Sequence, residues 1–120
     1  MPRPPNDLLH GTLDVLILKA LADRPRHGYD IARHVVEATG GAVVVEDGSL
    51  YPALYRLEKK GRIRGEWGVS DAGRRARFYR LTDPGRRALA RQTATWAKFS
   101  AGVSRLLLGG RSAPRRAGRS

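Results

Sequence analysis

Apolar residues recur at helical spacing in four stretches of the chain. Two of them, from about residue 8 to 22 and from about 28 to 38, place apolar residues every three or four positions. The third, from 49 to 60, has leucines at 50, 54 and 57, the stripe of an amphipathic helix that buries one face. The fourth runs from about 83 to 108. The pattern therefore predicts four helices, of which the last is the longest.

The third stretch also carries signals for both of its ends. Ser49 suits the N-cap, Pro52 falls in the first turn where no intrahelical donor is required, and Gly61 suits the position just past the helix. Thr82 suits the N-cap of the fourth helix, because an acidic residue and a proline follow it. We therefore expect the third helix to begin at Ser49 and the fourth at Asp83.

Between these two helices the apolar period changes to two. Residues 62–67 alternate between two faces, a polar turn follows over 68–75, and residues 76–81 alternate again. This predicts a two-stranded hairpin whose tip carries Arg74 and Arg75. A hairpin directly after a third helix is typical of a winged helix-turn-helix. The β-rich residues 42–45 are brief, and both a short strand and an extended connector fit them.

The last predicted helix carries apolar and small residues at alternating spacings of four and three. A small winged domain has nothing to cover the far half of such a helix, so we expect the helix to pair two subunits. Two roles fit Trp96 and Phe99, with packing favoured over the wall of a pocket for an aromatic or hydrophobic effector. The expected dimerisation residues are Leu89, Thr93, Trp96, Ser100, Val103 and Leu107.

The predicted fold class is mainly α with a small β-hairpin: a winged helix-turn-helix followed by a long C-terminal dimerisation helix. We expect a flexible N-terminal arm over residues 1–7 and the DNA-binding winged domain over 8–82. The dimerisation helix follows over 83–108, and a disordered basic tail over 109–120. The tail is expected to lack structure because it is rich in arginine, glycine and serine.

Charge points to a polyanionic partner. The chain has 120 residues with 23 Lys and Arg against 11 Asp and Glu, which gives a formal net charge of +12. Basic residues are concentrated from residue 56 to residue 80, in the third helix and the hairpin, and acidic residues are few there. The two elements are therefore expected to form one basic surface that binds double-stranded DNA.

Several other functions are not expected. The chain has no cysteine, which excludes disulfides, thiolate metal sites and a cysteine nucleophile. His10, His27 and His34 occur in a chain without cysteine and without paired carboxylates at ligand spacing, so we expect no metal and no cofactor. No catalytic triad or phosphate-binding loop stands out, so we expect no enzyme activity. No apolar run reaches membrane-spanning length and no signal peptide is evident, which favours a cytoplasmic protein.

The outer face of the third helix and the hairpin supply the candidate DNA contacts. Arg56 is the strongest candidate for a base contact, because a guanidinium can pair with O6 and N7 of guanine. Lys60 and the hairpin arginines fit contacts to phosphate or the minor groove. Tyr51 and Tyr55 border the buried stripe, so core packing and DNA contact both remain open for them. The full set of candidates is Ser49, Tyr51, Pro52, Ala53, Tyr55, Arg56, Lys60, Arg74, Arg75 and Arg77.

Five short motifs follow one another along the chain: Gly11-Thr12-Leu13, His27-Gly28-Tyr29, Gly48-Ser49-Leu50-Tyr51-Pro52, Arg74-Arg75-Ala76-Arg77 and Leu81-Thr82. In this order and spacing, they resemble the PadR family of bacterial transcriptional regulators. The resemblance runs from about residue 8 to 96, and the short C-terminal part is similar to the small subfamily with one dimerisation helix. It implies a winged-helix homodimer that binds inverted-repeat operators, commonly as a repressor that a small molecule releases.

Two alternative hypotheses remain at this point. A non-specific nucleic-acid-binding basic protein would have the same charge, but it would show little preference for a palindrome over random duplex. A winged-helix module that binds protein would shift no duplex at all. Neither explains the heptad-like last helix together with the winged pattern as simply as a dimeric regulator does.

Overall fold

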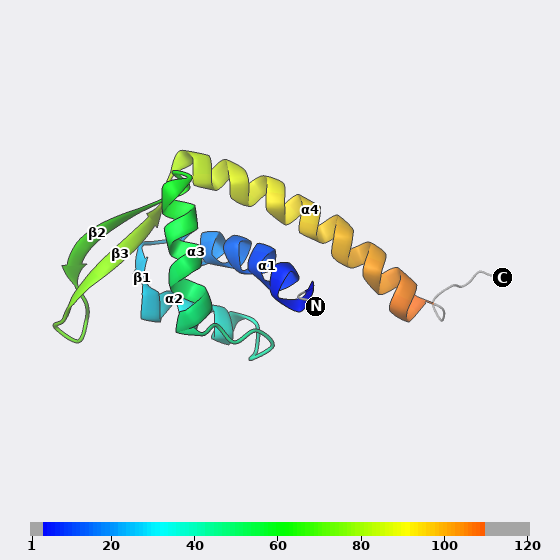
Figure 1. Ribbon diagram of the computed structural model, residues 1–120, viewed down its shortest axis with the longest axis horizontal. Helices are drawn as coiled ribbons and strands as arrows, with labels where there is room; N and C mark the ends of the chain where they lie inside the picture. The colour runs from blue at the N-terminus through cyan, green and yellow to red at the C-terminus, as the bar shows by residue number, and fades with distance from the viewer. Residues whose placement is uncertain (1–3, 110–120) are drawn as a thin grey trace. The chain divides into compact units, whose positions relative to one another are not determined.

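The computed structural model describes residues 4–109, with side chains from residue 11 onward (Figure 1). Four helices and three short strands confirm the predicted mainly helical class with a small sheet. The chain divides into two compact units at residues 89 and 90. In chain order the elements are α1 (Pro4–Ala20), β1 (Arg26–His27), α2 (Gly28–Ala38), α3 (Asp47–Lys59), β2 (Ile63–Val69), β3 (Arg75–Leu81) and α4 (Asp83–Leu108).

The core of the first unit lies where α1, α2 and α3 pack together and against the sheet. The predicted stripe of α3 is its centre, because Leu50, Leu54 and Leu57 are each at most 1% exposed. Full burial of a leucine side chain contributes about 1.5–3 kcal/mol, so these three residues alone hold α3 firmly. The other large buried side chains are Leu13, Ile17, Leu18, Leu21, Ile31, Val35, Ile63, Tyr79 and Leu81.

The sheet has the strand order β1-β3-β2, with all pairs antiparallel. The hairpin of β2 and β3, hereafter the wing, confirms the predicted two-stranded hairpin, with Ile63 opposite Leu81 and Val69 opposite Arg75. The third strand was not predicted. β1 contributes only two residues, Arg26 opposite Tyr79 and the next residue opposite Phe78, which is too short to show a period. Residues 42–45 form no strand, in agreement with the connector interpretation.

The start of α3 corrects the sequence analysis. The helix begins at Asp47 with Glu46 as the N-cap residue, so Ser49 lies inside the first turn and is not the cap. The backbone N–H groups of Ser49 and Leu50 both donate to the Glu46 carbonyl, at 3.0 and 2.9 Å. Pro52 therefore lies in the helix interior, where its missing N–H removes one intrahelical bond. The acidic Asp47 in the first turn favours the earlier start through the helix dipole.

Three other predicted boundaries can be compared with the structure. α1 begins at Pro4, so it extends into the segment expected to be an N-terminal arm. Gly61 has φ +75° at the end of α3, as predicted, and its N–H donates to the Glu58 carbonyl at 2.9 Å. α4 runs from Asp83 to Leu108 as predicted. Residues 1–3 of the expected arm and 110–120 of the expected tail lie outside the described residues.

Thr82 joins the end of α3 to the start of α4. Its Oγ1 accepts a hydrogen bond from the Gly85 N–H at 3.1 Å, which is the predicted cap, and donates to the Gly61 carbonyl at 2.6 Å. Gly85 is buried against the Arg62 carbonyl, and a Cβ at this position would overlap that oxygen. Only glycine therefore lets the first turn of α4 approach the chain after α3 so closely.

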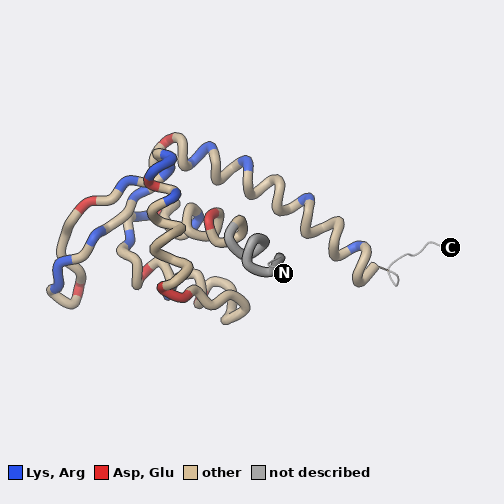
Figure 2. The backbone as a smooth tube through the Cα atoms, viewed as in Figure 1, with Lys and Arg blue, Asp and Glu red and all other residues tan. Residues whose placement is uncertain are grey.

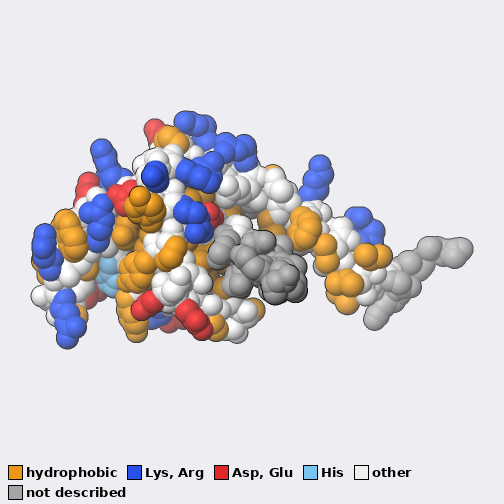
Figure 3. All heavy atoms as spheres, in the orientation of Figure 1, with side chains coloured by type: hydrophobic (Ala, Val, Ile, Leu, Met, Phe, Trp, Pro, Cys, Tyr) orange, Lys and Arg blue, Asp and Glu red, His pale blue; other side chains and the backbone are white. Residues whose placement is uncertain are grey.

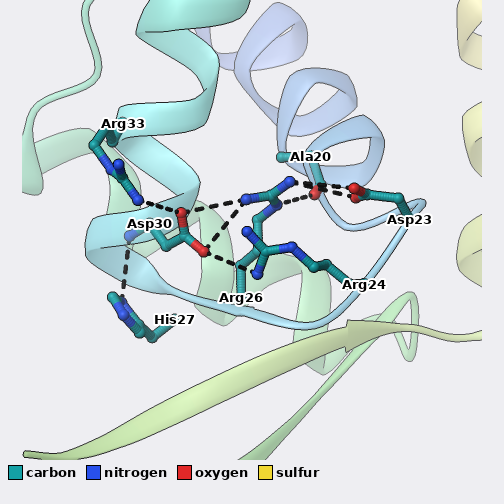
Figure 4. Close-up of polar contacts among 7 residues, drawn as sticks. All are labelled: Ala20, Asp23, Arg24, Arg26, His27, Asp30 and Arg33. Atoms are coloured by element: carbon teal, nitrogen blue, oxygen red, sulfur yellow. Dashed lines mark hydrogen bonds and ion pairs between the residues drawn. The ribbon is translucent and has the colours of Figure 1, made fainter. Parts of the chain in front are cut away.

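A buried ion-pair network holds β1 between α1 and α2 (Figure 4). The Arg26 guanidinium donates to the Ala20 carbonyl at the end of α1 (2.7 Å) and to both oxygens of Asp30 on α2 (3.2 and 3.3 Å). Arg24 and Arg33 also donate to the Asp30 carboxylate from more exposed positions. The strand that pairs with the wing is thus attached to two helices of the core.

Candidate nucleic-acid interface

The exposed face of α3 is aromatic and basic, as the sequence analysis expected. Tyr51, Pro52, Tyr55 and Lys60 are all exposed. Figure 2 shows basic residues toward the C-terminal end of α3 and along the wing, and acidic residues at the start of α3. Tyr55 is too exposed to be a core residue, and the Lys59 ammonium lies 5.6 Å from the centre of its ring. This face is therefore acidic at the start of α3, aromatic along its middle and cationic at its C-terminal end.

Ala53 does not belong to that face. Its side chain is fully buried, so its predicted place on the outer surface was wrong. The reason is helical geometry, because position 53 follows Leu50 by three residues and precedes Leu57 by four. Ala53 therefore lies inside the buried stripe and has no surface to offer to a ligand.

Tyr51 is partly packed and partly exposed, so both interpretations that the sequence left open still fit it. Its ring packs against Gly28 at the start of α2, where an added Cβ would lie 2.8 Å from the Tyr51 hydroxyl oxygen. Half of the side chain is nevertheless exposed. Because the hydroxyl oxygen lies against Gly28, the packed part of Tyr51 includes its polar end, and a ligand can reach only the exposed half of the residue.

Arg56 is tied to the protein. Its guanidinium donates to the Asp14 carboxylate of α1 at 2.8 Å, and the Arg56 side chain is 36% exposed. The pair spans two helices and is only partly buried. Arg56 is therefore a helix-to-helix contact in this structure, and it has to leave Asp14 before it can pair with a base.

The tip of the wing presents two arginines. Arg74 and Arg75 are both exposed, and the Arg75 guanidinium lies 4.3 Å from the centre of the Trp67 ring. Trp67 and Val69 are also largely exposed on β2. Figure 3 shows the basic side chains of the wing at the edge of the molecule. The tip therefore offers cations on an aromatic support.

Arg77 behaves differently from its neighbours. It points to the inner side of the wing, where its guanidinium donates to Glu58 of α3 at 2.6 Å. This hydrogen bond raises the pKa of the Arg77 guanidinium above its ordinary value, against the opposing effect of desolvation. Glu58 was not among the candidate residues predicted from the sequence. A signal was available, because the alternation of β3 puts Arg77 on the same face as the buried Tyr79 and Leu81, where a cation requires a partner.

A hollow of about 660 Å³ lies between the wing and the start of α2. Aromatic and basic side chains line most of it, and among its lining residues only Asp71 is acidic. A concave surface of this charge, next to an exposed helix, suits a phosphate backbone. The main lining side chains are His27, Arg33, Tyr51, Arg74, Arg75 and Arg77.

The second unit is the rest of α4, described here by itself. Its predicted seam is solvent-exposed at Trp96, Val103 and Leu107, while Ser100 is partly covered. The rings of Trp96 and Phe99 lie 5.9 Å apart. Leu106 and Leu108 extend the apolar surface, which is visible toward the end of α4 in Figure 3. Exposed apolar side chains in this number mark an interaction surface.

Two other classes of site can be assessed over the described part of the chain. Among residues 11–109, whose side chains the structure describes, no group of three or more His, Asp or Glu is arranged to hold a metal ion. Within the same range, no helix is long and apolar enough to cross a membrane.

Comparison with known proteins identifies the family. Residues 17–91, well over half of the chain, match the Transcriptional regulator PadR-like family. The chain belongs to the PadR-like family. It is 36% identical over 100 residues to a transcriptional regulator of Mycobacterium tuberculosis, which covers 80% of this chain and 82% of that protein. The matched region contains the wing and every candidate DNA contact named above.

Solved structures of PadR-like and other regulators share the fold. A transcriptional regulator from Clostridium thermocellum superimposes with a TM-score of 0.75 at 27% identity, covering 84% of this chain and 98% of that one. A PadR-like transcriptional regulator from Bacillus cereus has a TM-score of 0.71 at 28% identity, covering 85% and 97%. As a PadR-like protein, the chain is a DNA-binding winged-helix transcriptional regulator and not an enzyme.

Proposed function

We propose that this PadR-like regulator is a cytoplasmic repressor that binds an inverted-repeat operator as a homodimer. In this proposal α3 enters the major groove, and the wing reaches the phosphate backbone or the minor groove. The observation that carries the proposal is that both elements expose cations, Lys60 at the C-cap of α3 and Arg74 and Arg75 on the wing. A major groove about 12 Å wide admits one such helix.

Different parts of α3 are proposed to contact the bases and the DNA backbone. Recognition helices contact bases mainly through their N-terminal residues, so Ser49, Tyr51 and Pro52 are the residues nearest the base pairs. Tyr55 and Lys60 lie further along the helix, where the backbone passes. Arg56 exchanges Asp14 for a guanine edge when it binds, because a bidentate base contact replaces the ion pair that is lost.

The exposed seam of α4 supports pairing with a second copy of the chain. Val103 and Leu107 lie at successive seam positions and leave apolar surface in water, and burying it against an identical helix is favourable. A two-fold axis then sets the two α3 helices about one helical turn of DNA apart, roughly 10 base pairs. The same symmetry requires an inverted repeat in the operator.

Trp96 and Phe99 support an effector site at this interface. Their rings lie near each other, and the small residues Thr93 and Ser100 occupy neighbouring seam positions. Two such helices leave room for a planar aromatic or hydrophobic molecule. Its binding releases the operator by changing the separation of the two α3 helices, which is a shift between two states of the dimer.

The main experiment is a footprint of the purified protein on the DNA upstream of its own gene, with its mass measured by light scattering. We expect a protected palindrome and a dimer, with binding that weakens steeply as salt rises. Leu107→Asp should give a monomer with weak operator binding. Ala101→Asp is the matched control, because Ala101 is exposed on α4 outside the seam. A monomeric wild type, or equal protection of random duplex, overturns the proposal.

The effector site has a separate test. The chain has two tryptophans, so Trp67→Phe leaves Trp96 as the only one. The fluorescence of this variant is measured against a panel of planar aromatic compounds, and operator release is measured with the same panel. Emission that no compound changes counts against a pocket at Trp96.

A further inference from the structure

A single carboxylate joins α3 to both strands of the wing. Oε2 of Glu58, on the last turn of α3, accepts a hydrogen bond from Arg77 of β3 at 2.6 Å. It also accepts one from the backbone N–H of Gly65 on β2 at 3.3 Å. The helix that is proposed to enter the groove and the hairpin that is proposed to reach the backbone thus meet at one side chain.

The Arg77 side chain is held in place on three sides. It crosses Gly65 so closely that a Cβ there would lie 2.5 Å from Arg77 Nε. Its guanidinium lies 5.9 Å from the centre of the Trp67 ring and 5.8 Å from that of Tyr79. Trp67 in turn supports Arg75. A continuous series of contacts therefore runs from Glu58 on α3 to the cationic tip of the wing.

The outer part of the wing has few other attachments. β1 pairs with the wing only at Phe78 and Tyr79, so the hairpin beyond these residues has two strands and no third. An isolated two-stranded hairpin is marginally stable in water. Of the two Glu58 contacts, Arg77 lies at the first position past that pairing, and Gly65 lies opposite Tyr79 within it. Together they restrain the angle at which the hairpin leaves the core.

We propose that Glu58 is a positioning residue for DNA binding. It holds the wing at the angle that lets Arg74 and Arg75 reach the backbone while α3 occupies the groove. This inference rests on the proposed contact between wing and DNA. The proposal predicts that removing the Glu58 charge weakens DNA binding. The change in net charge alone predicts the opposite, because removing a carboxylate from a DNA-binding surface should strengthen binding to a polyanion.

That difference in sign defines the experiment. Operator affinity of the full-length protein is measured for Glu58→Gln and for Glu66→Gln. Glu66 is the matched control, since it is also on the wing, pairs with Arg80 from an exposed position, and changes the net charge equally. We expect Glu58→Gln to weaken binding about three- to tenfold and Glu66→Gln not to weaken it. Equal or tighter binding by Glu58→Gln overturns the proposal.

A double-mutant cycle separates positioning from a general effect on the fold. If Glu58 orients the wing, Arg74→Ala should cost less affinity in the Glu58→Gln protein than in the wild type, whereas independent effects add. Additive losses overturn the proposal, as does an Arg74→Ala protein that binds as well as wild type. Wild-type protein that binds no operator contradicts the proposed function itself.

Further measurements test whether the Glu58 variants keep the fold and loosen the wing. Glu58 and Arg77 are each 34% exposed, and partly exposed ion pairs contribute little to stability, so thermal unfolding should shift little in Glu58→Gln. Glu58→Asp keeps the charge and shortens the side chain, and it should also weaken binding. In a Trp96→Phe background, acrylamide quenching of Trp67 should rise in both Glu58 variants, and unchanged quenching contradicts the restraint.

Discussion

Replacing Asp30 with asparagine tests the buried network that anchors β1. The side chains of Asp30 and Arg26 are 11% and 6% exposed, and the Arg26 guanidinium donates to both carboxylate oxygens. The substitution keeps the shape of the side chain and removes its charge. It leaves the Arg26 cation buried without its main counter-charge, beside the cations of Arg24 and Arg33.

The expected loss of stability depends on which hydrogen-bond partners Arg26 retains in Asp30→Asn. Breaking a buried ion pair by removing one partner costs about 3–5 kcal/mol. Arg26 retains the Ala20 carbonyl at 2.7 Å and the exposed Asp23 carboxylate at 3.3 Å, which places the cost near the lower end, at about 3 kcal/mol. With a urea m-value of about 1.5 kcal/mol per M, the unfolding midpoint should fall by about 2 M.

The measurement is urea unfolding followed by circular dichroism at one fixed protein concentration, because the proposed dimerisation would make apparent stability depend on concentration. Asp23→Asn is the matched control, since it removes a carboxylate that also pairs with Arg26 but is 64% exposed. It should change the midpoint little. If the two variants unfold at the same urea concentration, or if Asp30→Asn costs under about 1 kcal/mol, the buried pair does not anchor β1.

Two other predictions concern binding and pH. Arg56→Ala should cost about 1–3 kcal/mol on the operator and much less on random duplex, because the base contact is lost; equal losses in fluorescence anisotropy titrations would exclude base recognition. Burial raises the pKa of the Tyr79 hydroxyl, against the opposing effect of Arg77, so its neutral form contributes stability below pH about 10 that is lost as pH rises through the folded-state pKa. Tyr79→Phe should remove this part of the alkaline destabilisation, and an unchanged pH profile of the urea midpoint would contradict it.

Several elements of the fold could be predicted from patterns within short stretches of the sequence. Leu50, Leu54 and Leu57 identified α3 because helix period and burial are linked along one segment. Alternating residues identified the wing for the same reason, and Thr82 and Gly61 marked two helix ends through local hydrogen bonding. The family resemblance also depended only on short motifs in order along the chain.

Other features could not be obtained in this way. β1 has two residues, and its pairing with Tyr79 joins positions far apart in the sequence. The start of α3 at Asp47 was missed because Glu46 caps the helix through its backbone carbonyl, without a side-chain hydrogen bond that its residue type would signal. Ala53 was misplaced because a small residue gives a weak signal for burial.

The sequence by itself determined the helices, the hairpin, the basic surface and the family, because each depends on neighbouring residues or on summed charge. Only the tertiary structure decided which basic side chains form ion pairs within the protein. Arg56 pairs with Asp14, 42 positions away, and Arg77 pairs with Glu58, 19 positions away. Such partners are chosen by distance in the folded chain, where a partly buried cation is more stable beside a carboxylate than alone.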